Sequence, residues 1–472
     1  MKPNRRFRRY GRPAPGWKRY QDELRVGRRR PRFRWARWLG LIGVFLVALY
    51  GVRLSPLDSA VFVPSALLPP NPPGVSNETA PGGAPPEPIH LIDKTDVQAL
   101  LEADLFHNLT EPQFDFTFDG RDFRVETTLD ARLQRNLLAT LQPEAARYLG
   151  AVVMEPNTGR VLAMVSYDSV DPGNNTCLES LFPAASVFKI VTAAAAIAEH
   201  DLGAESTLTY AGGKYTLYKS QIRELSGRKV HRITLRDSFA QSVNPVFGRL
   251  GARLLGKTAL VQHGEAFGFN RPIPFEIPVE TSPLRISDDP YQWAEVASGF
   301  NRTTLLSPLH GAMIAAAAAS DTGQLLAPTI VNRIRDDTGR PLYRAADAPL
   351  AVGQPLSSET AKAIRRLMGE TIRTGTCRRS FRGFEADPVL SRLEIGGKTG
   401  TMGSRIHPNR LYDWFVGFAE DKEGGRRIAV AIAVAHEKRI GTKAKRYARS
   451  IIQSYFQSHF AREKGAESAR SG

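Results

Sequence analysis

Two apolar hairpin patterns, about 240 residues apart, constrain the fold more than any other feature of the sequence. The first covers residues 150–166 around a turn at 156–159, and the second covers residues 411–435 around a polar turn at 420–425. Apolar runs on both sides of a short turn predict paired antiparallel strands. We therefore expect one sheet that is completed when the chain returns.

Helical patterns fill the space between the hairpins. They cover residues 186–199, 236–255, 307–319 and 359–373, and an amphipathic pattern follows at 443–460. Ser307 followed by Pro308 is typical of a helix N-terminus, and Thr128 or Asp130 is suited to cap an earlier helix. Strands at both ends with helices between them predict one α+β domain over residues 123–461.

The net charge of +17 is concentrated at the N-terminus. Residues 1–37 hold fifteen Lys and Arg against two acidic residues, and an uncharged apolar run follows up to residue 52. This run is short for a bilayer, which needs about 20 apolar residues, but Arg37 and Arg53 can extend their charges to the surface. We predict a basic cytoplasmic tail (1–37), a transmembrane signal anchor (38–53) and an exported remainder.

Two other interpretations of this N-terminus are weaker. A cleaved signal peptide has a shorter basic region and a small-residue cleavage site, which this sequence lacks. An arginine-rich tail can bind nucleic acid, but a flank that faces anionic lipid explains the same residues. We therefore expect an anchor in the inner membrane and no nucleic-acid partner.

Residues 54–122 are expected to form a periplasmic linker. Residues 54–90 are rich in proline and glycine, a composition that forms an extended spacer and not a core. The remainder predicts at most one short helix, over residues 96–105, and no independent domain. At the other end of the chain, residues 462–472 are expected to be a disordered tail.

Ser186 and Lys189 stand at the start of an alanine-rich apolar run. Residues three apart on a helix share a face, so the two side chains are expected to meet. The helix N-terminus favours negative charge developing on Ser186, and burial disfavours the charged form of Lys189. A serine beside a lysine that can be neutral is a nucleophile beside its base. Ser226 and Lys229 have the same spacing, but their polar, glycine-containing surroundings predict a loop.

Two further segments supply partners for this pair. Ser242 and Asn244 are two residues apart before Pro245, which favours irregular backbone, so both side chains can face a cleft; a simple capping turn is the alternative. Lys398 lies in a glycine-rich stretch whose open edge lets a ligand approach closely. That stretch ends like a Walker A loop, but Arg392 occupies the position of the required first glycine and a strand pattern follows, so we reject a nucleotide site.

The three motifs, S-x-x-K, S-x-N and K-T-G in this order, resemble the signature of penicillin-binding transpeptidases and serine β-lactamases. Residues 125–134, 307–310 and 414–418 also look typical of these domains, and the resemblance covers about residues 123–460. It implies a membrane-anchored monofunctional enzyme. It also implies an antiparallel sheet of about five strands flanked by helices, with an all-helical subdomain.

The resemblance implies a role for each motif residue. Ser186 attacks the carbonyl of a D-alanyl-D-alanine stem peptide, and Lys189 accepts its proton. Ser242 passes a proton to the departing D-alanine, while Asn244 holds the substrate amide and orients Lys189. An amine of a neighbouring stem peptide then attacks the ester and forms a cross-link. β-Lactam antibiotics would leave the serine blocked.

The third motif is implied to hold the substrate's terminal carboxylate through Lys398, Thr399 and Thr401, with Gly400 between them. The backbone N–H groups of Ser186 and Thr401 would form the oxyanion hole. No cofactor is implied, and no cluster of metal-ligating residues stands out in the sequence. Other cell-wall synthesis proteins are the expected partners, on the periplasmic side of the membrane.

Departures from related enzymes narrow this interpretation. The sequence lacks the E-x-x-L-N stretch that carries the deacylating glutamate of a class A β-lactamase, and Asn244 replaces the valine of a class D enzyme. The segment before residue 123 leaves no room for a glycosyltransferase domain. A D,D-carboxypeptidase, an endopeptidase, an atypical β-lactamase and a non-catalytic cell-wall scaffold remain as alternatives.

Cys177 and Cys377 are the two cysteines of the chain. An exported protein permits a disulfide, and the resemblance brings both segments towards the active-site cleft. A Cys177–Cys377 bond is therefore one expectation, and two unrelated thiols are the other.

Overall fold

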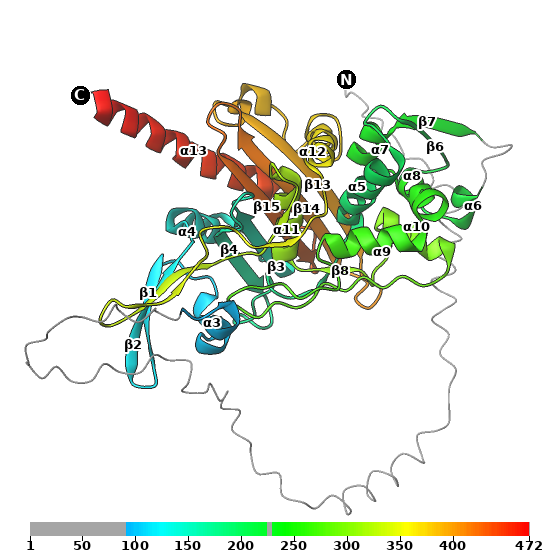
Figure 1. Cartoon of the computed structure of the whole chain (residues 1–472). Helices are drawn as coiled ribbons and strands as arrows, with labels where there is room; N and C mark the ends of the chain where they lie inside the picture. The colour runs from blue at the N-terminus through cyan, green and yellow to red at the C-terminus, as the bar shows by residue number, and fades with distance from the viewer. Residues whose placement is uncertain (1–90, 224–228, 472) are drawn as a thin grey trace, which may run out of the picture. The chain divides into compact units, whose positions relative to one another are not determined.

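A five-stranded antiparallel sheet forms the centre of the part of the chain that the computed structural model describes, residues 91–223 and 229–471 (Figure 1). Its strands, in spatial order, are β13 (Leu393–Gly403), β14 (Leu411–Asp421), β15 (Arg427–His436), β3 (Ala146–Met154) and β4 (Val161–Asp168). Both predicted hairpins are present, and β15 pairs with β3 to join them. The prediction of one sheet closed by the returning chain is confirmed.

Helices cover both faces of this sheet, so its central strands are continuously apolar and do not alternate. On one face lies α11 (Pro308–Ala319), whose residues are all buried. Ser307 caps α11 by accepting a hydrogen bond from the His310 N–H at 3.2 Å, as the sequence predicted. On the other face lie α4 (Ala131–Thr140), capped by Asp130, and α13 (Ala444–Ser471).

A helical region extends from the sheet and carries the second predicted motif. Its helices are α5 (Lys189–His200), α6 (Lys219–Ile222), α7 (Leu235–Ala240), α8 (Asn244–Arg249), η4 (Leu250–Leu255), α9 (Gly256–Ala266) and α10 (Pro290–Ser298). It is not all-helical, because β6 (Thr207–Ala211) and β7 (Val230–Thr234) form a hairpin within it. The helical pattern at 236–255 is interrupted before Asn244, where Pro245 disfavours helical backbone.

The folded chain begins earlier than predicted. α3 (Lys94–Leu100), η2 (Ala103–Phe106) and β1 (Gln113–Phe118) all lie in the range expected to be linker. β1 joins β2 (Arg121–Thr127), β10 (Val331–Asp336) and β11 (Pro341–Arg344) in a second sheet. Val97 and Phe106 are buried in the main core, so this segment is part of the domain.

The remaining boundary predictions have different outcomes. α13 continues to Ser471, so the expected disordered tail at 462–472 is helical up to that residue. The predicted cytoplasmic tail, anchor and proline-rich spacer, and Ser226, lie outside the described residues. Within the described ranges, no helix combines the length and the apolar character that crossing a membrane requires.

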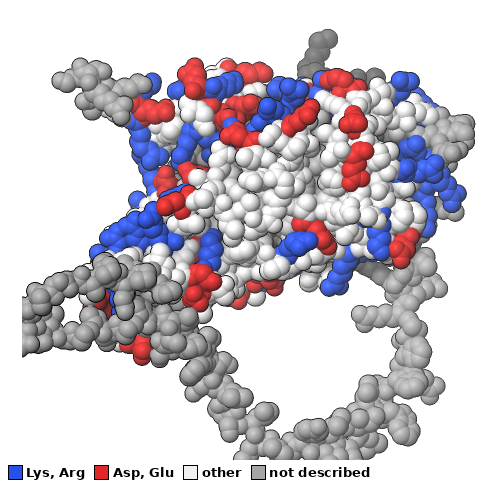
Figure 2. Space-filling view, viewed as in Figure 1, with Lys and Arg blue, Asp and Glu red and all other residues white. Residues whose placement is uncertain are grey.

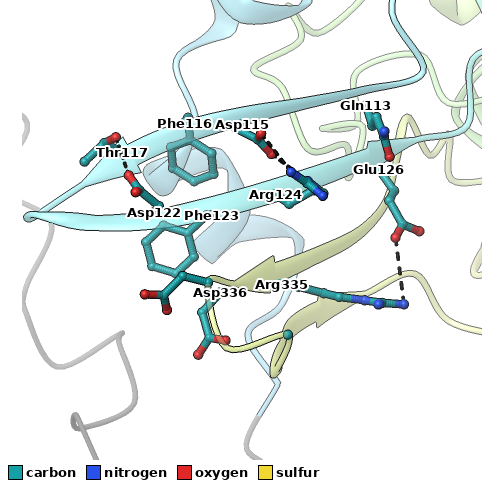
Figure 3. Close-up of a pocket in the computed structure, with 12 residues that line it drawn as sticks. Gln113, Asp115, Phe116, Thr117, Asp122, Phe123, Arg124, Glu126, Arg335 and Asp336 are labelled. Carbon is teal, nitrogen blue, oxygen red and sulfur yellow. Dashed lines mark hydrogen bonds and ion pairs between the residues drawn. The ribbon is translucent and has the colours of Figure 1, made fainter.

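Charged side chains of both signs are mixed on the face of the molecule seen in Figure 2. Side chains of both charges also line a cavity of about 680 Å³ at the second sheet (Figure 3). Arg124 donates to Asp115 at 2.7 Å, and Thr117 donates to Asp122 at 2.7 Å, each across a register pair of β1 and β2. These polar contacts link β1 to β2 across the strands and support the register of the hairpin.

The predicted disulfide is wrong. Cys177 and Cys377 are both free thiols and fully buried. Cys177 packs in the apolar cluster on the α11 face of the sheet, whereas Cys377 packs with Phe381 and Phe415 on the α13 face. The sheet separates the two residues, so the alternative of two unrelated thiols holds.

The N-terminal segment is fastened to the domain by a buried carboxylate. Glu276 is fully buried and accepts hydrogen bonds from the Thr329 hydroxyl at 2.8 Å and the Tyr343 hydroxyl at 2.9 Å. Lys94 of α3 completes the cluster, with its Nζ 3.2 Å from the carboxylate. Two hydroxyls and one ammonium from distant segments therefore compensate the same buried charge.

We expect Lys94→Ala to lower the free energy of unfolding by about 1.5–3 kcal/mol, because the buried carboxylate of Glu276 loses its cation. Lys257→Ala is the matched control, since its ion pair with Asp288 is exposed to solvent and is worth about 0–1 kcal/mol. Chemical denaturation of both variants measures the difference. An equal loss of unfolding free energy in the two variants would show that the Lys94–Glu276 pair does not hold the N-terminal segment on the domain.

Both thiols should be inert in the native protein, because burial raises the pKa of each to about 12. A thiol-alkylating reagent at neutral pH should label no cysteine in the native chain and two in the denatured chain, with or without reductant. Mass spectrometry counts the labels. A denatured chain that accepts two labels only after reduction would show that the two cysteines are bonded.

Candidate active site

Ser186 lies in a tight turn that leads directly into a buried helix. The turn is the 3₁₀ helix η3 (Ala185–Phe188), and α5 follows it without a break. The Trp414 Nε1–H of β14 donates to the Pro183 carbonyl oxygen at 2.9 Å and so ties the turn to the sheet. Ala185 has a φ of 48°, a left-handed conformation that is costly for a residue with a β-carbon. The half-buried serine is thus held by a strained, anchored backbone.

Two glycines allow neighbouring elements to approach this turn. A β-carbon on Gly299, just after α10, would lie 1.8 Å from the Ala185 carbonyl oxygen and 2.8 Å from the Ser186 nitrogen. A β-carbon on Gly400 of β13 would meet the Ala185 β-carbon at 3.2 Å. The predicted site residue Gly400 therefore lies against the turn that presents Ser186.

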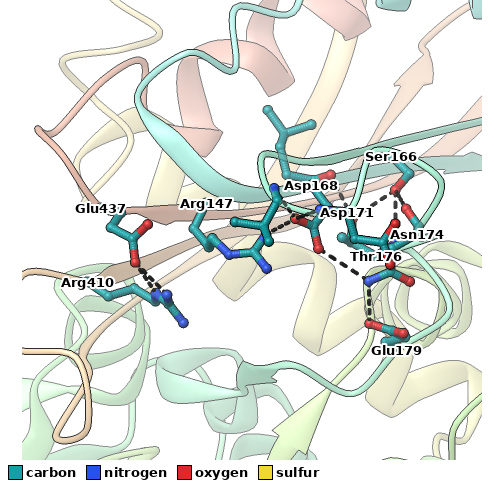
Figure 4. Close-up of polar contacts among 11 residues, drawn as sticks. Arg147, Ser166, Asp168, Asp171, Asn174, Thr176, Glu179, Arg410 and Glu437 are labelled. Carbon is teal, nitrogen blue, oxygen red and sulfur yellow. Dashed lines mark hydrogen bonds and ion pairs between the residues drawn. The ribbon is translucent and has the colours of Figure 1, made fainter.

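The segment that leads to the turn is fixed by polar contacts at the end of the sheet (Figure 4). Arg147 forms an ion pair with Asp168, and Asn174 donates to Glu179 at 3.0 Å. The Thr176 hydroxyl donates to the Leu149 carbonyl oxygen of β3 at 2.8 Å. These contacts hold the loop after β4 in place before the chain turns towards Ser186.

Lys189 is fully buried, and its amine has three neighbours. Lys189 Nζ lies 2.8 Å from Ser186 Oγ, 2.8 Å from Asn244 Oδ1 and 2.5 Å from the Ser298 carbonyl oxygen. Burial lowers the pKa of Lys189 well below its usual value, and the nearby charge of Lys398 lowers it further. A neutral amine has two hydrogens and one lone pair. In that form the amine can donate to the amide oxygen and the carbonyl, which leaves its lone pair for the serine hydroxyl.

Ser242 and Lys398 form a second pair on the other side of the site. Lys398 Nζ donates to Ser242 Oγ at 3.0 Å and to the Thr399 carbonyl oxygen at 2.9 Å. Lys398 is fully buried, and burial lowers its pKa to about 7. Ser242 has a φ of 57°, in the break between α7 and α8. Because the serine oxygen accepts from the lysine, its own hydrogen is available for another acceptor.

Asn244 links the two motifs of the helical region. Its Oδ1 accepts from Lys189, and its Nδ2 donates to the Tyr215 carbonyl oxygen at 3.1 Å. This second bond fixes which end of the amide faces the lysine.

The other predicted residues of the third motif lie on the edge strand β13. Thr399 is half-buried, with its Oγ1 2.6 Å from Thr376 Oγ1, and Thr401 is exposed, with its Oγ1 3.4 Å from Asp413 Oδ1. With Lys398 beside Ser242, the strand presents an ammonium and two hydroxyls along one edge. Such a row can bind a carboxylate.

The structure therefore brings the predicted residues together in two linked groups. Ser186, Lys189 and Asn244 form one group, and Ser242, Lys398 and Thr399 form the other, with Gly400 and Thr401 next to both on β13. Sequence reasoning missed the Ser298 carbonyl and Thr376. Gly299 follows a helical stretch, and a glycine in that position indicates a turn. Nothing in the sequence shows that the carbonyl of the residue before it, Ser298, accepts from Lys189.

Elsewhere in the described residues, Asp421, His459 and Glu463 place possible metal-ligand atoms within 4.8 Å of one another. Burial lowers the pKa of His459, and Arg426 and Arg462 lower it further against the opposing effect of Glu463 and Asp421. A cation at this position would therefore face two like charges. None of these residues contacts the serine and lysine groups.

Comparison with known proteins matches the penicillin binding protein transpeptidase domain to residues 149–453 of this chain. Stage V sporulation protein D of Bacillus subtilis is 27% identical over an alignment of 337 residues that covers 66% of this chain and 50% of that protein. Peptidoglycan D,D-transpeptidase PbpA of Mycobacterium tuberculosis is 26% identical over an alignment of 362 residues that covers 67% of this chain and 69% of that protein. The chain thus spans half the length of the Bacillus relative.

Solved structures show the same similarity. The D,D-transpeptidase domain of a peptidoglycan glycosyltransferase from Eggerthella lenta aligns with a TM-score of 0.58 at 25% identity, covering 71% of this chain and 83% of that one. Penicillin-binding protein A from M. tuberculosis, solved as an imipenem acyl-enzyme complex, has a TM-score of 0.58 at 24% identity. That alignment covers 70% of this chain and 79% of the other, and it shows a shared fold.

The buried ammonium of Lys398 should make stability depend on pH. The folded protein holds this proton with a pKa of about 7, against 10.5 for the ordinary side chain. Between these values the unfolded chain binds more protons, so stability rises as the pH increases and is flat below this window.

We expect the free energy of unfolding of the wild type to rise relative to that of Lys398→Met, by up to about 4 kcal/mol from pH 7 to pH 10. Denaturant titrations at a series of pH values measure this difference, and the exposed Lys257→Met is the control. If the free energy of unfolding changed with pH equally in wild type and Lys398→Met, the lowered pKa of the buried lysine would be wrong.

Proposed function

Because the chain belongs to the penicillin binding protein transpeptidase family, we propose that it is a peptidoglycan D,D-transpeptidase that works through an acyl-serine intermediate. One observation carries the proposal. The fully buried Lys189 amine lies 2.8 Å from the Ser186 hydroxyl while two other oxygens occupy its hydrogens. This arrangement suits a general base that is neutral before the reaction begins.

In the first half-reaction, Ser186 Oγ attacks the carbonyl of the last peptide bond of a D-alanyl-D-alanine stem peptide. Lys189 takes the hydroxyl proton, and the backbone N–H groups of Ser186 and Thr401 receive the developing oxyanion. The C–N bond breaks, Ser242 gives its hydroxyl proton to the departing D-alanine, and the proton held by Lys189 replaces it. The hydrogen bond from Lys398 leaves the Ser242 hydroxyl hydrogen free for this transfer.

The departing residue carries a carboxylate, for which the edge of β13 is suited. Lys398 supplies a cation, and Thr399 and Thr401 supply hydroxyl donors. Asn244 holds the substrate amide with the same side chain that orients Lys189. A β-lactam presents a comparable carboxylate and acyl group, so we propose that penicillins acylate Ser186 and leave it blocked.

In the second half-reaction, an amine of a neighbouring stem peptide attacks the ester. The new C–N bond forms, the C–O bond to Ser186 breaks, and the serine recovers its proton. We further propose that residues 38–53 anchor the chain in the inner membrane, with residues 1–37 in the cytoplasm and the catalytic domain in the periplasm. Other cell-wall synthesis proteins would be its partners there.

Acylation is tested with a fluorescent penicillin. We expect the wild type to be labelled stoichiometrically, Ser186→Ala to remain unlabelled, and Lys189→Met to react at least about 10²-fold more slowly, because it lacks the base. Ser226→Ala, which changes the serine of the other S-x-x-K match, is the control and should label normally. An unlabelled wild type would refute the proposal and favour a non-catalytic scaffold.

The acceptor of the acyl group is tested on a synthetic pentapeptide with a free amine. Formation of a cross-linked dimer, followed by mass spectrometry, is the expected product of the wild type. Release of tetrapeptide alone would identify a D,D-carboxypeptidase, and rapid hydrolysis of the penicillin would identify a β-lactamase.

A further inference from the structure

A cavity of about 770 Å³ opens beside the third motif. Thr399 and Thr401 of β13 form one wall, and Tyr215 belongs to a second wall next to Asn244. The remaining wall is the loop over residues 374–385, which follows α12 (Ser358–Arg373). Thr376 of this loop touches Thr399, with 2.6 Å between the two hydroxyl oxygens. The cavity is thus continuous with the proposed carboxylate position.

The cavity lining is strongly basic. Five cationic side chains line it, against the two carboxylates of Asp413 and Glu385; the five are Arg373, Arg378, Arg379, Arg382 and Lys445. Asp413 is buried and already accepts a hydrogen bond from the Ala444 N–H at 2.8 Å. The excess of positive charge therefore faces the cavity.

Two of the five cations have partners within the fold. Arg373 pairs with Glu370 at 3.4 Å, and Lys445 donates to the Thr376 carbonyl oxygen at 2.7 Å. The side chains of Arg378, Arg379 and Arg382 are exposed and make no hydrogen bond or ion pair with another described residue. These three guanidinium groups, which we term the arginine triplet, are available to an anionic ligand.

The order of the reaction indicates which ligand this is. In the proposed mechanism, D-alanine leaves with its carboxylate over Thr399 and Thr401. The attacking amine must then reach the same ester from the space that D-alanine vacated. The rest of the acceptor extends from that space, and the cavity that shares Thr399 and Thr401 begins there. An acceptor stem peptide carries free carboxylates, which guanidinium groups bind well.

We propose that this cavity is the acceptor subsite and that the arginine triplet binds the free carboxylates of the acceptor stem peptide. The inference rests on the proposed function, and it says which acceptor the second half-reaction prefers: one with free carboxylates. The acceptor enters as a neutral amine, forms the new C–N bond to the acyl carbon, and the C–O bond to Ser186 breaks. One amine proton returns to the serine oxygen through Lys189, so the step consumes no other reactant.

The arginine triplet would help this step in two ways. It would orient the acceptor through groups that water lacks, which favours transfer over hydrolysis. Its positive field would also lower the pKa of the incoming ammonium and increase the neutral, nucleophilic fraction. Neither effect acts on the donor, so acylation should be insensitive to the triplet.

The test uses the full chain in detergent, as wild type and as the triple variant R378Q/R379Q/R382Q. R366Q is the matched control, because Arg366 is an exposed arginine of α12 outside the cavity lining. Each protein is acylated by a donor ending in D-Ala-D-Ala and offered one synthetic stem peptide in two forms, with its carboxylates free or amidated. Fluorescent-penicillin labelling reports acylation and folding, and mass spectrometry separates transfer from hydrolysis.

We expect the triple variant to keep wild-type acylation and hydrolysis and to lose about tenfold or more of its transfer to the free-acid acceptor. Each exposed charge contact contributes about two- to fivefold. Transfer to the amidated acceptor should be equal in all three proteins. R366Q should match the wild type throughout.

Other outcomes overturn the inference in distinguishable ways. Slower acylation of the triple variant would assign the arginines to the donor, and equal transfer to both acceptors by all proteins would leave the cavity without a role. Weaker binding to vesicles of anionic phospholipid, with transfer unchanged, would identify a lipid-facing surface. A wild type that is never acylated would overturn the proposed function itself, and this inference with it.

Discussion

The structure depends on keeping one lysine amine dry and correctly surrounded. A buried ammonium is costly, and the cost is reduced when the group is neutral and hydrogen-bonded. Lys189 meets this requirement with three oxygens from three different elements: η3, α8 and the end of α10. Two of these oxygens can only accept, so a neutral amine that donates to both would direct its lone pair at the third, the Ser186 hydroxyl. The helical region supplies two of the three oxygens, so in the proposed mechanism it orients the base.

The second constraint is that the central sheet must come close to the turn that carries Ser186. β13 reaches the turn that carries Ser186 only because Gly400 has no side chain, and Gly299 allows the end of α10 to touch the same turn. A second buried lysine, Lys398, then lies near enough to lower the pKa of Lys189 further. In the proposed mechanism the two lysines have different roles: a neutral Lys189 accepts the serine proton, and Lys398, with a pKa of about 7, carries charge towards an anion.

The sequence predicted those features whose cause is local. Ser307 caps α11, Pro245 interrupts the helical pattern before Asn244, and the two apolar hairpins join in one sheet. It failed where the cause is distant, as with the Ser298 carbonyl and the opposite placement of the two cysteines. One local signal was overlooked: Asp119-Gly120, between alternating aromatic residues of β1 and β2, is a strong indication of a hairpin. That hairpin, with α3 before it, moves the start of the domain into the predicted linker.

The same division between local and distant causes explains why the arginine triplet could not be predicted. Its residues belong to a polar loop that, in sequence alone, has the composition of solvent-exposed turns. The contact between Thr376 and Thr399 brings the loop to the third motif, and it joins residues 23 positions apart. This hydroxyl pair therefore connects β13, which is suited to the carboxylate of the leaving D-alanine, with the arginine triplet, which is suited to the acceptor. In the proposed mechanism the acceptor enters as the leaving group departs, so one cavity must serve both, and Thr399 lies in its wall next to Lys398.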